Sequence, residues 1–198
     1  MPDRLQDGAH AALRAATEAA HLRLHAIPVF QALAEGRITR AAYADLLRRK
    51  LGFHAALEAR LAEVPALAGF GIDLTARRRT HLLRADMAWL GAEADVPWSP
   101  LPAFAGPAAA LGGLYVAEGS TLGGRQLALA LGGILPPGLD GRRFLLGHGA
   151  RHGEMWRSCC AAIERCGTAP QARAEMVQGA LATFAAFESW FTDVPAEA

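Results

Sequence analysis

Helical spacing of apolar residues along almost the whole chain is the feature that most constrains the fold. From residue 10 to residue 27, apolar side chains recur every three or four positions, and Pro28 ends the pattern. No segment has the alternating apolar and polar residues, or the enrichment in β-branched residues, that strands require. With 52% hydrophobic and 20% charged residues, the chain is too apolar to be disordered. The pattern predicts an all-α fold of helices joined by short loops.

Capping and helix-breaking residues divide the chain into six expected helices. Thr39 is suited to cap the second helix, Pro65 ends it, and Gly91 ends the third. A proline-rich run over residues 92–107 predicts an irregular connection between two halves of the chain. We expect the helices to span residues 10–27, 40–64, 75–90, 108–131, 142–166 and 170–190.

Size and charge set the broad class of the protein. The 198 residues predict a single domain over residues 1–198, with loose termini at 1–8 and 193–198. Twenty basic and nineteen acidic side chains leave a net charge of +1, which disfavours a nucleic-acid partner. No stretch approaches eighteen uninterrupted apolar residues, so we expect neither a signal peptide nor a membrane span. Three cysteines clustered within eight residues fit a reducing compartment, and we expect a cytoplasmic protein.

The first expected helix carries a candidate ligand for a metal. His21 lies at the edge of the apolar stripe, with Thr17 on the same side and Arg14 two turns before it. A neutral imidazole there could bind a metal, while Arg14 could meet a carboxylate roughly 10 Å away along the axis. An anionic planar cofactor with a central metal would require both a ligand for the metal and a cation for its carboxylate. His25 could instead be the ligand or share the metal, or His21 could be an ordinary boundary histidine with Arg14 in solvent.

Five glycines occupy the apolar helical segment between residues 112 and 124. Together they should cost roughly 4 to 5 kcal/mol relative to alanine, so an ordinary core helix would hardly be built this way. Gly112, Gly119 and Gly123 are seven and four residues apart and are expected to share one face. A flat ligand could lie on that face, and the helix could bend there. Close helix–helix contact through small residues is the alternative.

Both segments resemble heme oxygenases. Residues 13–21 (LRAATEAAH) are similar to the proximal-helix motif of that family, and residues 115–124 (YVAEGSTLGG) resemble the distal helix of its bacterial branch. The likeness extends in order and spacing through most of the chain, including residues 153–158 (GEMWRS). It implies a single-domain helical fold that holds heme between a proximal N-terminal helix and a glycine-rich distal helix.

The resemblance also implies roles for individual residues. His21 matches the axial iron ligand, and the backbone of Gly119 and Gly123 matches the cover of the opposite heme face. On the propionate side, Arg14, Tyr115 and Arg157 match groups that bind the carboxylates, with Thr17 beside them. Ser120 stands where the animal-type motif has an aspartate, and a hydroxyl is a weaker organiser of the water that delivers protons.

The activity implied is the oxidative opening of heme b, both substrate and cofactor, to biliverdin, with release of iron and carbon monoxide. Electrons must come from an external donor, a ferredoxin or a flavin reductase, because the sequence has no dinucleotide-binding fingerprint. A bacteriophytochrome is one expected recipient of the biliverdin. Two alternatives remain open: a heme-binding or storage protein without turnover, and a thiaminase-like enzyme of similar architecture that would need an active-site cysteine.

Overall fold

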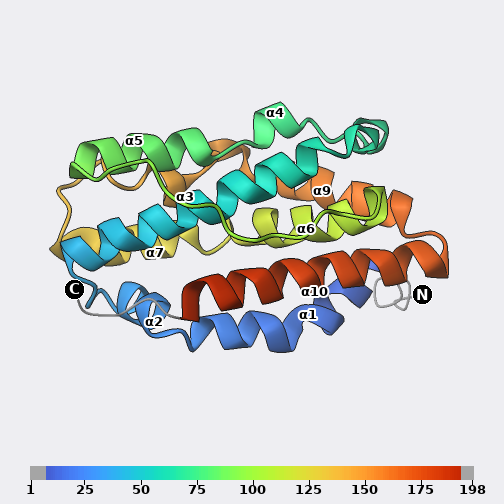
Figure 1. The fold of residues 1–198 in the computed structure, drawn as a ribbon, viewed down its shortest axis with the longest axis horizontal. Coiled ribbons are helices and arrows are strands. Elements are labelled where there is room, and N and C mark those ends of the chain that lie inside the picture. The colour runs from blue at the N-terminus through green and yellow to red at the C-terminus, as the bar shows by residue number, and fades with distance from the viewer. Residues whose placement is uncertain (1–7, 193–198) are drawn as a thin grey trace.

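A computed structural model describes residues 8–192, which form helices and connecting loops without any strand (Figure 1). The all-α prediction is therefore confirmed for this part of the chain. The expected loose segments 1–8 and 193–198 lie outside the described residues, except for Gly8, which directly precedes the first helix. The α-helices are α1 (Ala9–His25), α2 (Pro28–Ala34), α3 (Arg40–Ala62), α4 (Leu74–Arg77), α5 (Thr80–Leu90), α6 (Pro107–Gly119), α7 (Gly124–Ala130), α8 (Arg143–Leu146), α9 (His152–Cys166) and α10 (Pro170–Thr192). Short 3₁₀ helices are η2 (Pro65–Phe70), η3 (Leu131–Gly133) and η4 (Gly149–Arg151).

Local capping explains where several of these helices begin. The N–H of Ala42 donates to Thr39 Oγ1 at 3.1 Å, which confirms Thr39 as the cap of α3. Pro28 begins α2 rather than only ending α1, because its fixed φ suits a first helical position. The third expected helix is divided, since the Glu58 carboxylate accepts hydrogen bonds from the N–H groups of Arg79 and Thr80 and thereby starts α5.

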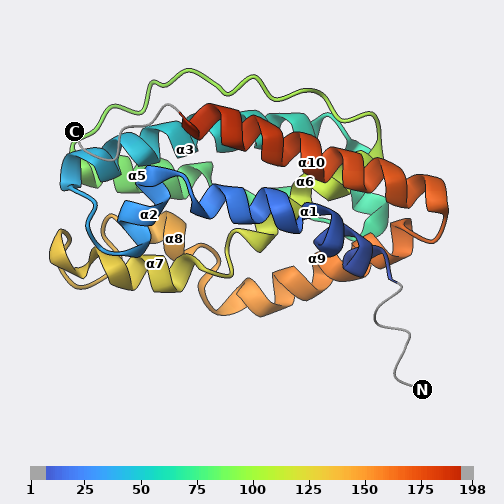
Figure 2. The same ribbon diagram turned by 90° about the horizontal axis from the view of Figure 1, so that it is seen from below.

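The two longest helices, α3 and α10, organise the packing. Helix α10 lies along both α6 and α1, α3 packs against α5, and α6 packs against α9 (Figures 1 and 2). The proline-rich connection is irregular, as predicted, and runs along α3, where the N–H of Ser99 donates to the carbonyl of Gly52 at 3.3 Å. None of the helices formed by residues 8–192 combines the length and apolar character that crossing a bilayer demands.

Helices α6 and α10 approach closely through glycines. A Cβ atom on Gly112 would lie 2.0 Å from the carbonyl oxygen of Met176, and one on Gly179 would lie 2.1 Å from that of Ala109. Neither backbone can move independently, because both helices are buried along this contact. Gly112 therefore serves helix packing and does not belong to an exposed strip.

We expect Gly112→Ala to destabilise the fold by about 2 kcal/mol or more, because the new methyl group forces α6 and α10 apart. The measurement is the free energy of unfolding from denaturant titration. Gly132→Ala is the matched control, because a Cβ there meets nothing within 4 Å, and its unfolding free energy should change by less than about 0.5 kcal/mol. Equal effects of the two substitutions would contradict this account of the α6–α10 contact.

Candidate functional site

The His21 imidazole is exposed on α1 and faces α10 with one edge. Its ring centroid lies 4.7 Å from that of His25 and 6.4 Å from that of Phe184. Partial loss of hydration, together with the nearby His25, lowers the pKa of His21 below its ordinary value of 6.5. His21 is therefore neutral at pH 7, and a neutral imidazole has a lone pair for a metal.

Tyr115 of α6 brings two of the other candidate residues together. Burial raises the pKa of Tyr115, while the Thr17 hydroxyl and the Arg14 guanidinium of α1 partly oppose this rise. The Thr17 hydroxyl itself is buried and donates to the carbonyl oxygen of Leu13 at 2.7 Å. Residues that the sequence analysis selected on two separate segments therefore meet at one place in the fold.

Aromatic rings continue this site toward α9. The Tyr115 ring lies 5.7 Å from that of Trp156, and His10 lies within 6 Å of both rings. Arg157 follows Trp156 and is exposed. Within residues 8–192, neither the Arg157 nor the Arg14 guanidinium forms a hydrogen bond or an ion pair, so both charges are available to a ligand. The structure shows no contact of Arg157 with Tyr115, Thr17 or Arg14.

The expected helix over residues 108–131 is interrupted by a turn at residues 120–123. Hydroxyl groups compete with the backbone there, since Ser120 Oγ donates to the carbonyl of Ala117 and Thr121 Oγ1 to that of Glu118, each at 2.7 Å. Arg79 Nη2 also donates to the Ala117 carbonyl, at 2.9 Å, and to Ser120 Oγ, at 3.1 Å. The Ala117 carbonyl is thus taken by side chains, and α6 stops at Gly119. We call residues 120–123 the distal turn.

The five glycines divide into two groups with different surroundings. A Cβ on Gly113 would lie 2.3 Å from the Phe104 ring, and one on Gly124 would lie 2.0 Å from the Leu145 carbonyl oxygen, so these two share the packing role of Gly112. A Cβ on Gly119 would meet only Trp156, at 3.8 Å, and one on Gly123 would meet nothing within 4 Å. The expected continuous strip of Gly112, Gly119 and Gly123 is therefore wrong, because Gly112 faces α10. Gly123 is in open space, and Gly119 leaves room for no more than ordinary contact with Trp156.

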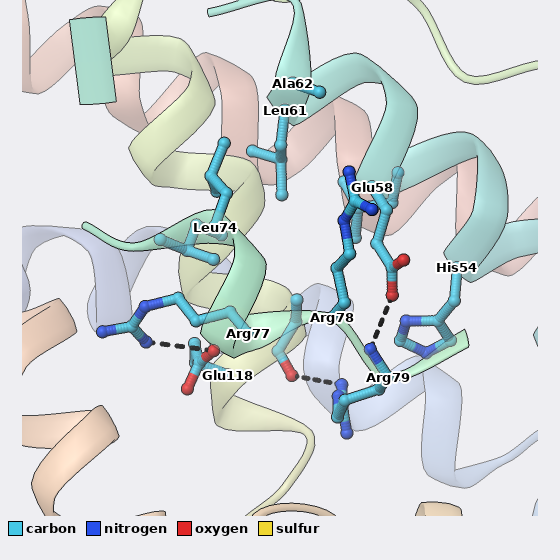
Figure 3. A pocket seen from close by; sticks show the side chains of 12 residues that line it. His54, Glu58, Leu61, Ala62, Leu74, Arg77, Arg78, Arg79 and Glu118 are labelled. Carbon is cyan, nitrogen blue, oxygen red and sulfur yellow. Dashed lines mark hydrogen bonds and ion pairs between the residues drawn. The ribbon is translucent and has the colours of Figure 1, made fainter. Parts of the chain in front are cut away.

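A cavity of about 30 Å³, lined by apolar side chains together with several charged ones, lies between α3, α4 and α6 (Figure 3). Its buried ion pair joins Arg77 Nη1 to Glu118 Oε1 at 3.0 Å, and both Arg77 Nη atoms donate to the Met155 carbonyl at 3.3 Å. His54 lines the cavity from α3. Burial lowers the pKa of Arg79 to about 10, with Glu118 and Glu58 opposing the shift, so Arg79 stays charged at pH 7.

His54, Arg79 and Lys50 are functional candidates that the sequence reasoning missed. Burial and the charges of Arg79 and Lys50 lower the pKa of His54 well below 6.5, so its imidazole is neutral at pH 7. The one sequence signal was the run of three arginines at residues 77–79, inside the helix expected over residues 75–90. A charge run normally predicts a solvent-exposed surface, and only the tertiary fold places Arg77 and Arg79 inside.

The cysteines lack the surroundings of a catalytic nucleophile. Cys159 is fully buried, and burial raises the pKa of its thiol far above the ordinary value. Burial also raises the pKa of Cys160 and of Cys166. A reactive cysteine needs a lowered pKa, so these thiols speak against the thiaminase-like alternative.

Comparison with known proteins gives a consistent assignment. The sequence model of the heme oxygenase family matches residues 7–193. A heme oxygenase of Xanthomonas campestris pv. campestris (strain 8004) is 36% identical over 169 residues, which cover 81% of this chain and 95% of that protein. The structure of the NO- and CO-bound heme oxygenase from Neisseria meningitidis superposes with a TM-score of 0.81 at 26% identity, covering 97% of this chain and 94% of that one. This chain belongs to the heme oxygenase family and is an enzyme of heme degradation with that family's all-α, single-domain fold.

Proposed function

We propose that heme b binds between α1 and the distal turn, with its iron on His21 and its opposite face against Gly119 and Gly123. The observation that carries this proposal is the meeting of Thr17 and Arg14 with Tyr115. Helices α1 and α6 run in the same direction in both views (Figures 1 and 2). One helical turn, about 5.4 Å, leads from Thr17 to His21 and equally from Tyr115 to Gly119. His21 and Gly119 therefore lie at the same level along the two helices.

The surrounding groups fit the two propionates of heme. Arg14 and Arg157 are exposed guanidinium groups, and such groups bind carboxylates in a bidentate manner. The Tyr115 hydroxyl stays protonated at pH 7, since burial raises its pKa, and so can donate a hydrogen bond. We assign the carboxylates to Arg14, Tyr115 and Arg157, with Thr17 beside the Tyr115 hydroxyl.

Heme is the substrate, and its iron supplies the activation of dioxygen. The protein's own groups then have limited tasks. Neutral His21 would bind the iron, and the glycine backbone at residues 119 and 123 would leave room for dioxygen. Ser120 donates its proton to the Ala117 carbonyl and accepts a hydrogen bond from Arg79, so we infer that it orients a water molecule as an acceptor. Protons then reach the site through water rather than from the Ser120 hydroxyl.

We further propose that a ferredoxin or a flavin reductase supplies the electrons in the cytoplasm, and that a bacteriophytochrome receives the biliverdin. Support for an external donor is the lack of a dinucleotide-binding fingerprint in the sequence. Reconstitution with each class of reductase tests the electron donor. Transfer of the product to a purified apo-bacteriophytochrome, followed by its absorbance, tests the recipient.

Arg14→Glu should weaken heme binding roughly two- to tenfold or change the ratio of biliverdin isomers, because a carboxylate would repel the propionate that Arg14 attracts. The effect is modest because the Arg14 side chain is exposed. Optical titration measures the affinity, and chromatography measures the isomers. Arg84→Glu on α5 makes the same charge change away from the site and should alter neither. If Arg14→Glu also leaves both unchanged, Arg14 does not belong to the site.

A further inference from the structure

Lys50 is the single lysine among the 198 residues, and the other nineteen basic side chains counted with it are arginines. It lies on α3 with its ammonium group among aromatic rings. The distances from Nζ to the ring centroids are 4.9 Å for Phe30, 5.4 Å for Phe187, 5.6 Å for Phe144 and 5.7 Å for Phe191. Within residues 8–192, no oxygen atom accepts a hydrogen bond from Nζ and no carboxylate pairs with it. Leucine or methionine would fill this space without desolvating a charge, so packing alone does not explain Lys50.

Contacts in two directions place Lys50 beside the proposed heme site. On one side it lies against Phe187, one helical turn along α10 from Phe184, which contacts His21. On the other side, both Lys50 and Arg79 contact the ring of Phe144. The guanidinium carbon of Arg79 lies 4.8 Å from the centroid of that ring. Arg79 in turn donates to Ser120 of the distal turn. Aromatic contacts therefore link Lys50 both to the α10 segment that His21 faces and to the Arg79 that holds the distal turn.

The electrostatics around Lys50 favour an anion. Glu58 and Glu118 act on Arg79, whereas among residues 8–192 the charge that acts on Lys50 is that of Arg79. Burial and the charge of Arg79 lower the pKa of Lys50 to about 7. A negative ligand next to Nζ would restore the charged form and relieve this cost.

We propose that Lys50 positions anionic ligands on the open face of heme, through a hydrogen bond from Nζ to a ligand held opposite His21. This inference rests on the heme placement proposed above. The ligands are small inorganic anions such as azide or fluoride, and the same donor meets the negative charge that reduction places on dioxygen. Lys50 is a ligand-positioning residue outside the proximal and distal motifs of the sequence.

The single lysine allows a direct test on the unaltered protein. Protein labelled with ¹³C at Cε and ¹⁵N at Nζ of lysine gives one side-chain NMR signal. We expect that signal to lose most of its intensity in the ferric heme complex and to stay sharp in the zinc protoporphyrin complex, which is diamagnetic. The same signal intensity and position in both complexes would overturn the proposal.

Azide affinity of the ferric heme complex tests the charge itself. Lys50→Met should weaken azide binding about tenfold or more, because a charge-assisted hydrogen bond is lost, and should leave the affinity for neutral imidazole within about twofold. Arg48→Met is the matched control, since it removes one charge from the opposite side of α3, where Arg48 pairs with Asp45 at 3.5 Å. It should change azide affinity by less than about twofold.

Different results would refute the role of Lys50 and the proposed placement of heme. Unchanged azide affinity in Lys50→Met, or an equal loss of azide and imidazole affinity, would show that Lys50 only fills space. A heme complex without a His21-ligated spectrum would refute the placement and the inference together. A normal His21-ligated complex with an unaffected lysine signal would refute the inference alone.

Discussion

His21→Ala is expected to abolish the histidine-ligated spectrum of the ferric heme complex and to stop formation of biliverdin. The neutral imidazole of His21 is exposed on α1, and in the proposed placement of heme alanine would leave the iron without that ligand. Folding should be unaffected, because the side chain that is removed contributes little to the core. Optical and EPR spectra of the heme complex measure the ligation, and chromatography measures the product. Added imidazole should restore part of the ligation.

His25→Ala is the control for this prediction. His25 lies one turn further along α1, and its ring centroid is 4.7 Å from that of His21, so the variant removes the neighbouring imidazole and keeps His21. The variant should keep the histidine-ligated spectrum and the activity. If His25→Ala loses the ligation while His21→Ala retains it, the assignment of the iron ligand is wrong.

Two neighbouring glycines should respond to substitution in opposite ways. Gly123→Leu places a side chain in the open space of the distal turn, where no protein atom lies within 4 Å of the new Cβ. We expect unfolding free energy within about 1 kcal/mol of the parent and retained ferric heme binding. Turnover should fall roughly tenfold to a hundredfold, because the leucine occupies the volume that dioxygen and its water need. Single-turnover kinetics of the heme complex measure this loss.

Gly124→Ala should instead damage the fold, because its Cβ would lie 2.0 Å from the carbonyl oxygen of Leu145. We expect a loss of about 2 kcal/mol or more in unfolding free energy. Gly132→Leu controls for the added side chain, since Gly132 is also in open space but belongs to η3. That control should keep both stability and turnover. A Gly123→Leu enzyme that forms biliverdin at the parent rate would show that the distal turn does not cover the reacting face.

The helical architecture was predictable because its signals are local. Apolar spacing identified the helical segments, and Thr39, Pro65 and Gly91 marked ends that the structure retains to within a few residues. The break at Gly119 was not predictable in the same way. It depends on Arg79, which is forty residues away in the sequence and takes the Ala117 carbonyl only after the chain has folded.

The candidate site, too, was predictable only where its signals are local in the sequence. Residues on one helix, such as Arg14, Thr17 and His21, could be selected from their shared face and the family resemblance. Helical periodicity could not distinguish the packed glycines from the open ones. The packed glycines are those that contact α10 or the Leu145 segment, and these contacts form only in the tertiary fold. Lys50 was missed since its environment comes from α2 and, above all, from α8 and α10, which are more than ninety residues away in sequence.

Product formation from a preformed heme complex distinguishes an enzyme that opens heme from a protein that only binds it. The ferric heme complex of the unaltered protein, at one heme per chain, is mixed with a reductase, its electron source and dioxygen in the presence of catalase. Heme oxygenase activity predicts loss of the Soret band together with the appearance of biliverdin, identified by chromatography, and the release of iron and carbon monoxide. A Soret band that persists under these conditions would contradict it and would indicate a heme-binding protein without turnover.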